Sequence, residues 1–451
     1  MSIGSDLVEL TRRLCEVQTA VVADGNSELF RRIEEEIPLR FFSFESGSTF
    51  NGWKVPDNWR VKKAKIFCDG EEIFDCAKNA LGVGYYSKSF TGELTIDQLK
   101  SFLVTNPNLP DAFMFHCMWQ YRPWDANWVL SVPYNVCKNW GEGVYRVELS
   151  TEYESSEMLV AHAEVRGSSK KTVVFNSHTC HPHMANDGLA GAAVFIRLMQ
   201  ELSTRENHYT YRLVLAPEHI GTVFYLRDLP EEELADLVCG VFQEMPGTAG
   251  AVKATSTFLG GQKVDIAFAN VLKHSTNAFE LVPWRKGAGN DETVWEAPGY
   301  EVPFVELTRC EDQFAPFREY HSHLDTADIL DECQMEEVYE VLEGMVFILE
   351  NDATLHRKFN GLICLSNPEY GLYMERPDPT VTKDLDEDAE KWGHLLDCVF
   401  RYMDGSKTIL EIAELHDLPF PRLLRYFQRF EEKGLLELRF AEINRERPSR
   451  C

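Results

Sequence analysis

A dense group of potential metal ligands lies in the segment NSHTCHPHMANDGLAG, residues 176–191. His178 stands just past a β-branched and aromatic run (TVVFN, 172–176), and Asp187 stands just before an apolar helical pattern. The carboxyl ends of strands in an open α/β sheet border the ligand crevice, so both side chains are predicted to face one cleft. Imidazole and carboxylate are ligand types that Zn²⁺ prefers. Taken alone, such a pair is more often a simple hydrogen-bonded pair.

Three further predicted strands end in residues of the same kinds. These strands are YRLVLA (211–216), VCGVF (238–242) and VPFVEL (302–307). The residues that follow them are Glu218 and His219, then Glu244, and finally His321, His323 and Asp325. Four strand ends that each supply His, Asp or Glu to one face are the pattern of a metal-centred hydrolase.

The elements that must position these residues alternate between strand and helix from about residue 167 onward. The strand candidates are continuous apolar runs, as in buried parallel strands. Apolar residues at helical spacing over 189–202, and a long helical pattern over 332–350, fall between or after them. Residues 7–37 begin with another helical stripe. This order predicts an α/β fold with a doubly wound, mostly parallel sheet.

Three other segments differ from this strand–helix alternation in their residue pattern. Residues 41–166 consist of short β-rich pieces separated by Gly, Pro and Asp-Gly turn signals, which predicts an antiparallel β-rich unit. Residues 366–390 are Pro-rich and then strongly acidic, which is typical of a linker. Residues 391–445 carry three short helical patterns, then a glycine and a short apolar strand, in the order of a winged helix-turn-helix. The catalytic domain is then expected from residues 1–40 and 167–365.

The composition is that of a globular protein with an acidic surface. Hydrophobic residues make up 44% and charged residues 26% of the 451 residues. The 45 basic and 72 acidic residues give a net charge of −27, which opposes non-specific binding to nucleic acid or to anionic membranes. No apolar run of membrane-spanning length and no signal-peptide pattern occurs, and the 12 cysteines are scattered without a CxxC pair. We therefore expect a cytoplasmic protein with reduced thiols.

The C-terminal segment could in principle read DNA. Arg422, Arg425 and Arg429 share one face of a predicted helix. Residues 383–439 nevertheless contain 9 basic and 13 acidic residues, a net charge of −4. Nucleic acid is therefore not the expected partner, and a solvated face on a protein-interaction or lid domain is favoured.

The motifs together resemble those of a known enzyme group. In their order they are similar to the zinc exopeptidases of the bacterial leucyl aminopeptidase and glutaminyl cyclase type. More closely, the chain resembles a bacterial family of aminopeptidase-like proteins, which carry a β-rich domain inserted early in the peptidase fold and a winged helix at the C-terminus. The motifs that carry these likenesses are SHTCHP, ANDGLAG, PEHIG, EMPG, YHSHLDT, GNDE and the W-VP opening of the insert.

The resemblance implies a role for each matching position. Asp187 would bridge two metal ions or anchor one, with His178 and His321 as imidazole ligands on opposite sides. Glu244 would be a carboxylate ligand. Glu218 would be the general base that takes a proton from a zinc-activated water and passes it to the leaving amine.

Two departures from the exopeptidase pattern leave the ligand set open. The second acid of Glu-Glu-x-Gly is His219, which could itself bind zinc. The acid of His-x-Asp is Cys180, so the group that orients His178 is missing or replaced. Further imidazoles close enough to contribute are His181, His183 and His323. The sequence is thus compatible with one Zn²⁺ or two.

The implied reaction is cleavage of an amide bond in a small peptide or aminoacyl conjugate. An exopeptidase must also hold a free ammonium group, for which Asp291 and Glu292 are candidates, the alternative being a solvated turn. If no acidic side chain approaches the substrate amine, an N-acyl deacylase is favoured over an aminopeptidase. A catalytically inactive, ligand-sensing regulator that acts through the winged helix is a further alternative, although it would not need Glu218. The resemblance also implies a role beside polysaccharide or specialised-metabolite biosynthesis, and assembly into a homo-oligomer stays open.

Overall fold

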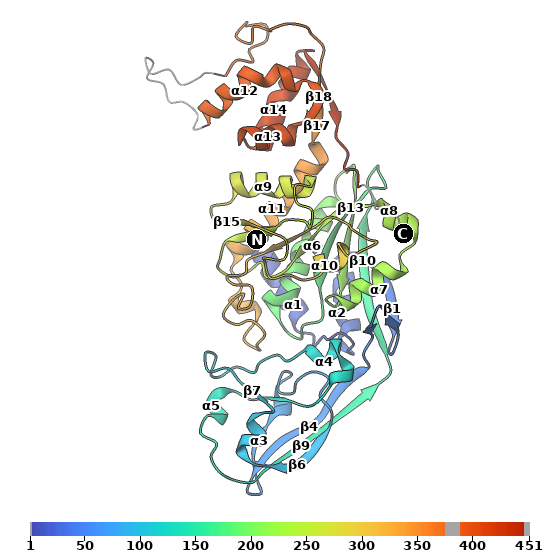
Figure 1. Cartoon of the computed structure of the whole chain (residues 1–451), viewed down its shortest axis with the longest axis vertical. Coiled ribbons are helices and arrows are strands. Elements are labelled where there is room, and N and C mark those ends of the chain that lie inside the picture. The colour runs from blue at the N-terminus through green and yellow to red at the C-terminus, as the bar shows by residue number, and fades with distance from the viewer. Residues whose placement is uncertain (1, 375–387, 446–451) are drawn as a thin grey trace.

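The computed structural model describes residues 2–374 and 388–445 of the chain. Figure 1 shows three parts along the long axis of the molecule: a central α/β unit, a β-rich unit at one end and a mainly helical unit at the other. Within the described residues, no helix has both the length and the apolar character needed to span a bilayer.

The central unit is built on an eight-stranded sheet in the order β1-β10-β12-β11-β13-β16-β14-β15. In this order the strands are Arg40–Glu45, Glu157–Val165, Thr210–Ala216, Thr172–His178, Leu237–Gln243, Phe304–Thr308, Val252–Thr255 and Phe279–Val282. Strands β12, β11, β13 and β16 run parallel to one another, whereas β1, β10 and β14 join the sheet through antiparallel pairs. The predicted α/β class with a mostly parallel sheet is confirmed.

Helices cover both faces of this sheet. One face packs against α1 (Ile3–Cys15), α6 (Ala190–Leu202), α9 (Lys263–Ser275) and α11 (Glu332–Asn351) in one large apolar core. The other face packs against α7 (Ile220–Asp228), α8 (Glu231–Asp236) and α10 (Glu292–Trp295) in a second core. Every residue of β11, β12 and β13 is buried, as expected for strands covered on both sides. The carboxyl ends of these three strands are therefore held in fixed positions.

The β-rich unit has a sheet and a core of its own. Strands β4 (Asn58–Cys68), β5 (Glu71–Asp75), β6 (Phe90–Leu94) and β9 (Tyr145–Glu154) form an antiparallel sheet in the order β5-β4-β9-β6. The ring of Trp128 stacks on Phe90 and on Phe102, with centroid distances of 4.4 and 4.2 Å. The other strands and α-helices of the β-rich unit are β2 (Thr49–Phe50), β3 (Trp53–Lys54), β7 (Leu103–Val104), β8 (Leu130–Ser131), α3 (Ile96–Lys100), α4 (Met118–Tyr121) and α5 (Tyr134–Cys137). Helix α2 (Gly25–Glu34) belongs to the central unit.

Two strands from the range predicted as the β-rich unit, residues 41–166, pair in the central sheet instead. Strand β1 pairs with β10 over six residues, and β10 pairs with β12. Their sequences have the same short β-rich texture as the strands of the separate sheet. Only long-range pairing, which local sequence does not encode, distinguishes the two groups.

The C-terminal unit contains α12 (Ala389–Tyr402), α13 (Ile409–His416), α14 (Phe420–Glu432), β18 (Asp404–Thr408) and β19 (Leu436–Phe440). Strand β17 (Ala353–Arg357), which precedes the predicted linker, lies between β18 and β19 in a three-stranded antiparallel sheet. The buried amide of Asn270 on α9 accepts from the Phe420 backbone N–H and donates to the Leu418 carbonyl. These bonds fix the unit against the central one. Of the predicted linker, residues 375–387 lie outside the described part of the chain.

Gly240 in β13 provides a test of the packing between neighbouring strands. A Cβ at this position would lie 2.0 Å from the Phe304 ring, which belongs to the adjacent strand β16. We expect Gly240→Ala to lower the free energy of unfolding by about 1–3 kcal/mol, because the ring must shift. Urea denaturation followed by circular dichroism measures the change. Gly141→Ala, at a position where a Cβ would contact nothing within 4 Å, is the control; equal midpoints for the two variants would contradict this account.

Candidate metal centre

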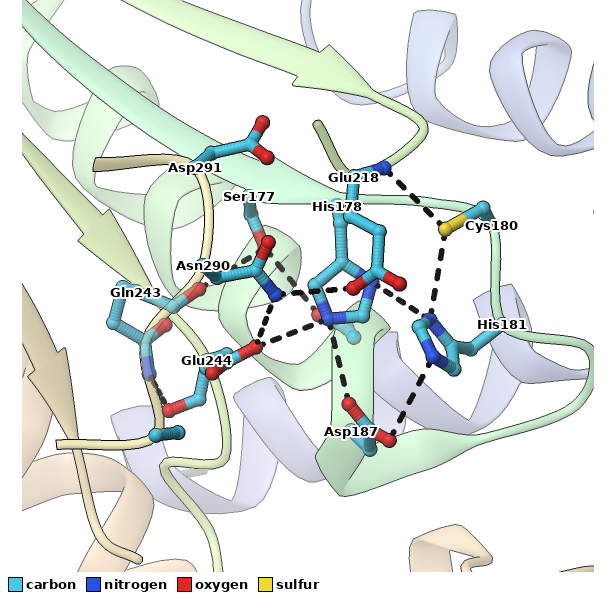
Figure 2. Close-up of polar contacts among 12 residues, drawn as sticks. Ser177, His178, Cys180, His181, Asp187, Glu218, Gln243, Glu244, Asn290 and Asp291 are labelled. Carbon is cyan, nitrogen blue, oxygen red and sulfur yellow. Dashed lines mark hydrogen bonds and ion pairs between the residues drawn. The ribbon is translucent and has the colours of Figure 1, made fainter. Parts of the chain in front are cut away.

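Three adjacent strands of the central sheet deliver the side chains of the candidate site to one edge (Figure 2). His178 is the last residue of β11, Glu218 follows β12 by two residues, and Glu244 directly follows β13. Asp187 lies in the short helical turn Ala185–Leu189 before α6, and His321 lies in the loop between β16 and α11. The structure thus brings together five of the eight residues that the sequence placed at a common cleft.

Asp187 is at the centre of two overlapping ligand sets. In the first, His178 Nε2 lies 3.4 Å from Asp187 Oδ1 and 3.3 Å from Glu244 Oε2. In the second, Asp187 Oδ2 lies 3.2 Å from His321 Nε2 and 3.9 Å from His181 Nε2. Each carboxylate oxygen of Asp187 therefore faces one set.

The donor atoms fit zinc. His178 Nε2 and Asp187 Oδ2 are buried and have no hydrogen-bond partner among the described residues. Burying such atoms is costly unless an ion pair or a metal ion satisfies them. Ligand atoms about 2.0 Å from a tetrahedral zinc ion are about 3.3 Å apart, which matches the three shorter separations. Both of these sets consist of imidazole and carboxylate groups that zinc accepts, and a third, overlapping group of possible ligands comprises His178, Cys180, His181 and Glu218.

Asp325 holds Asp187 in place. Its two carboxylate oxygens accept the backbone N–H groups of Asn186 (2.8 Å) and Asp187 (2.9 Å), and its own carbonyl accepts the N–H of Ala185 (3.2 Å). Burial, together with the charge of Asp187, raises the pKa of Asp325 to about 7. The sequence marked Asp325 only as one of several acids near a strand end, without this positioning role.

The turn that carries Asp187 requires a glycine beside it. Gly188 has a φ of +132°, and a Cβ there would lie 3.0 Å from His178 Cε1. A side chain at this position would therefore strain the backbone and press on the imidazole ring. The close approach lets His178 and Asp187 lie side by side.

His181 packs against His178 and faces Asp187 with its other ring nitrogen. His181 Nδ1 lies 3.1 Å from His178 Nδ1 and 3.6 Å from the Cys180 sulfur, while its Nε2 faces Asp187. Burial raises the pKa of the Cys180 thiol, but the adjacent His181 and His178 lower it to about 7. The sequence left His181 as one of several possible ligands, and its place was decided by the fold of the loop after β11.

Two neutral donors fix the Glu218 carboxylate. The Tyr121 hydroxyl donates to Oε1 (3.0 Å), and the Asn290 side-chain amide donates to Oε2 (3.1 Å). The same amide nitrogen lies 3.0 Å from Glu244 Oε2, so Asn290 offsets the repulsion between two close carboxylates. Sequence reasoning missed both donors; Asn290 stands in the GNDE motif, but no local signal marks Tyr121.

The electrostatic surroundings keep Glu218 ionised. Burial raises its pKa, but the electrostatic influence of the neighbouring His181, His178 and His219 outweighs this effect and lowers the pKa to about 2. Its carboxylate is therefore ionised at neutral pH.

His219, which the sequence offered as a possible zinc ligand, lies outside both ligand sets. It has a φ of +55° at the start of α7. The ring stacks on Trp53 at a centroid distance of 6.2 Å and its Nδ1 lies 3.9 Å from Asp291. His183 and His323 also lie outside the ligand sets, in contact with the Cys15 carbonyl and the Phe113 N–H respectively.

The two acids expected to bind a substrate amine are used inside the protein. Asp291 is fully buried and accepts hydrogen bonds from the His219 backbone N–H and the Thr222 hydroxyl. Glu292 is also buried and accepts from the Asn290 N–H (2.7 Å) and from Arg285 (2.9 Å). Burial forces both carboxylates to find internal partners, and neither faces the cleft.

A pocket of about 530 Å³ adjoins Glu218. One wall is the turn between β2 and β3, and another is α4 with the short helical turn that follows it. Both walls belong to the β-rich part of the chain, which therefore completes the cleft.

Comparisons with known proteins agree with this architecture. The family described as "Domain of unknown function (DUF4910)" matches residues 8–352. A Clostridium acetobutylicum protein, named as a presumed polysaccharide biosynthesis protein with an aminopeptidase-like domain, is 25% identical over 93% of each chain. The crystal structure of a presumed peptidase from the same species has a TM-score of 0.79 at 23% identity and covers 96% of each chain.

The fold of the zinc aminopeptidases is also matched. A zinc aminopeptidase from Bacillus subtilis has a TM-score of 0.56 at 12% identity, over 76% of this chain and 93% of that one. The predicted resemblance to aminopeptidase-like proteins is thereby confirmed, and at this identity the likeness to the enzyme shows the fold alone.

The hydrogen bonds of Asp325 predict a measurable effect on metal binding. Asp325→Asn replaces one acceptor oxygen with an amide that cannot accept from the backbone of Asn186 and Asp187. We expect zinc affinity to fall roughly 10–100-fold, since such orienting partners have effects of this size. Competition titration against a chromogenic chelator measures it. Asp328→Asn, at an exposed carboxylate three residues away, should bind zinc like the unaltered protein; equal affinities for both variants would refute the positioning role.

Proposed function

The chain belongs to the family of the domain of unknown function DUF4910, and we propose that it is a zinc-dependent amide hydrolase of aminopeptidase type that acts on a small peptide or aminoacyl conjugate. The observation that carries the proposal is the meeting of His178, Asp187 and Glu244 at one sheet edge, with the Glu218 carboxylate beside them. An ionised carboxylate next to a ligand set is the arrangement that hydrolysis by water needs.

The two ligand sets correspond to two zinc positions that share Asp187. His178, Asp187 and Glu244 would hold one ion, and His181, Asp187 and His321 would hold the other. When bound, zinc lowers the pKa of water from about 15.7 toward about 7 and polarises a carbonyl oxygen.

Glu218 performs the proton transfers. Its oxygens, held by Tyr121 and Asn290, accept a proton from the attacking water and deliver it to the leaving nitrogen of the amide. Because both donors are neutral, they fix the direction of the carboxylate without neutralising its charge.

The two ligand sets predict the zinc stoichiometry. We expect two zinc ions per chain in the unaltered protein and one in His181→Ala, because only the second set loses a ligand. Mass spectrometry of metal content after dialysis measures both. His183→Ala removes a nearby imidazole that belongs to neither set and should retain two ions. Two ions in His181→Ala, or one in the unaltered protein, would show that the second set is not a zinc site.

The role of Glu218 predicts a loss of turnover without loss of metal. Glu218→Gln should reduce kcat on aminoacyl or acyl chromogenic amides about 10²–10⁴-fold, since the amide cannot accept the proton. Zinc content should stay unchanged, and a chelator should abolish the turnover of the unaltered protein. Glu232→Gln, at an exposed acid on α8, is the control. Undiminished turnover in Glu218→Gln would exclude it as the base.

A second candidate reaction is N-acyl deacylation. It is favoured by one observation: Asp291 and Glu292 are engaged in internal hydrogen bonds and do not offer a carboxylate to a substrate ammonium group. Matched amides with a free or an acetylated amine separate the two reactions, because an aminopeptidase requires the free amine and a deacylase does not.

We propose that the C-terminal unit is a winged helix that serves protein contacts or caps the molecule and does not read DNA. The three arginines of α14 support this, because all of them have partners within the protein. Arg422 pairs with Asp388 (2.9 Å), Arg425 donates to the Pro421 carbonyl, and Arg429 donates to the Gly371 carbonyl. A regulator without catalysis would not need the organised carboxylate of Glu218.

The strand pairing supports a revised division of the chain. We propose that β1 and β10 belong to the catalytic domain, so that the insert comprises residues 46–156. The cytoplasmic location and the small peptide or aminoacyl substrate are carried forward as proposals, supported by the scattered cysteines and by the modest pocket volume.

A further inference from the structure

The pocket beside Glu218 has a mainly apolar lining. Met118 and Trp124 line it with 44% and 59% of their surfaces exposed, and Trp53 contributes a ring on another side. Exposed apolar side chains that gather in a concave site next to catalytic groups are typical of ligand contact. The lining therefore suits a flat apolar group of the substrate.

Arg122 supplies positive charge to this pocket. Its side chain is exposed and lines the pocket, and no carboxylate among the described residues pairs with its guanidinium. The protein as a whole carries a net charge of −27, so an unpaired arginine in a cleft is a local exception. Guanidinium groups bind carboxylates through two parallel hydrogen bonds.

Arg122 directly follows Tyr121, which contacts Glu218. Tyr121 donates a hydrogen bond to Glu218, and both residues line the same pocket of about 530 Å³. A ligand whose amide lies at Glu218 can thus extend toward Arg122 within one small cavity.

The positions of the acidic side chains also favour a negatively charged ligand in this pocket. Among residues 2–374 and 388–445, Glu218 is the one acid that lines the pocket, while Asp291 and Glu292 are engaged inside the protein. The pocket therefore offers a cationic anchor and lacks a dedicated anionic one.

We propose that this pocket binds an amino-acid carboxylate: the substrate is an amide whose one half is an amino acid with a free carboxylate on Arg122 and a flat apolar side chain against Met118, Trp124 and Trp53. This inference rests on the proposed hydrolase function and names its substrate class. Dipeptides with a free C-terminus and N-acylated aromatic amino acids both satisfy it.

Binding to the zinc-free protein tests the anchor without involving metal or turnover. Isothermal titration calorimetry compares N-acetylphenylalanine with its neutral carboxamide. We expect the carboxylate to bind at least about tenfold more tightly, the effect of one charged hydrogen-bonded pair. Arg122→Gln should abolish this preference, and Arg122→Lys should retain part of it. Arg401→Gln, at an exposed arginine of α12, is the charge-matched control and should keep the full preference.

The outcomes separate this inference from the proposed function. Equal affinity for carboxylate and carboxamide, or a preference that persists in Arg122→Gln, would overturn the carboxylate anchor. Inorganic phosphate that binds as tightly as N-acetylphenylalanine would overturn it as well, in favour of a phosphate site. Hydrolysis of phenylalanine-containing dipeptides by the zinc-loaded protein tests the hydrolase function separately. Turnover without an Arg122-dependent preference for the carboxylate would contradict only the carboxylate anchor. An Arg122-dependent preference without turnover of any amide would contradict only the hydrolase function.

Discussion

The structure depends on the burial of one carboxylate, Asp187, between imidazoles at the edge of the central sheet. A buried carboxylate is stable only when positive charge or hydrogen-bond donors surround it. His178 and His321 approach its two oxygens from opposite sides, while one oxygen keeps no hydrogen-bond partner. This pairing forces the loop after β11, the turn before α6 and the loop after β16 to meet at one point.

The surrounding residues position Asp187 and its neighbouring ligands. Asp325 binds the backbone on which Asp187 stands, and Gly188 leaves room for the His178 ring. Asn290 lies between the carboxylates of Glu218 and Glu244 and donates to both. Asn290 is a neutral donor, so it leaves the charge of both carboxylates in place.

The β-rich part of the chain contributes to the cleft as well as extending the molecule. Tyr121 donates a hydrogen bond to Glu218, and Trp53 stacks on His219, so the edge of the candidate site contacts two segments from far away in the sequence. The pocket between these segments sets the size of ligand that can approach Glu218. In the proposed function, the inserted unit therefore contributes to substrate choice, while the reacting groups belong to the central sheet.

Much of the fold and of the centre could be predicted from the sequence because the signals are local. Buried parallel strands read as continuous apolar runs, and their carboxyl ends must meet, so His178, Glu218 and Glu244 could be brought together without coordinates. Side-chain direction and long-range pairing are not local. The His219 ring stacks on Trp53 outside the ligand sets, whereas the loop after β11 brings His181 to Asp187. Burial commits Asp291 to internal donors, and pairing moves β1 into the central sheet, because each depends on contacts between segments that only the folded chain brings together.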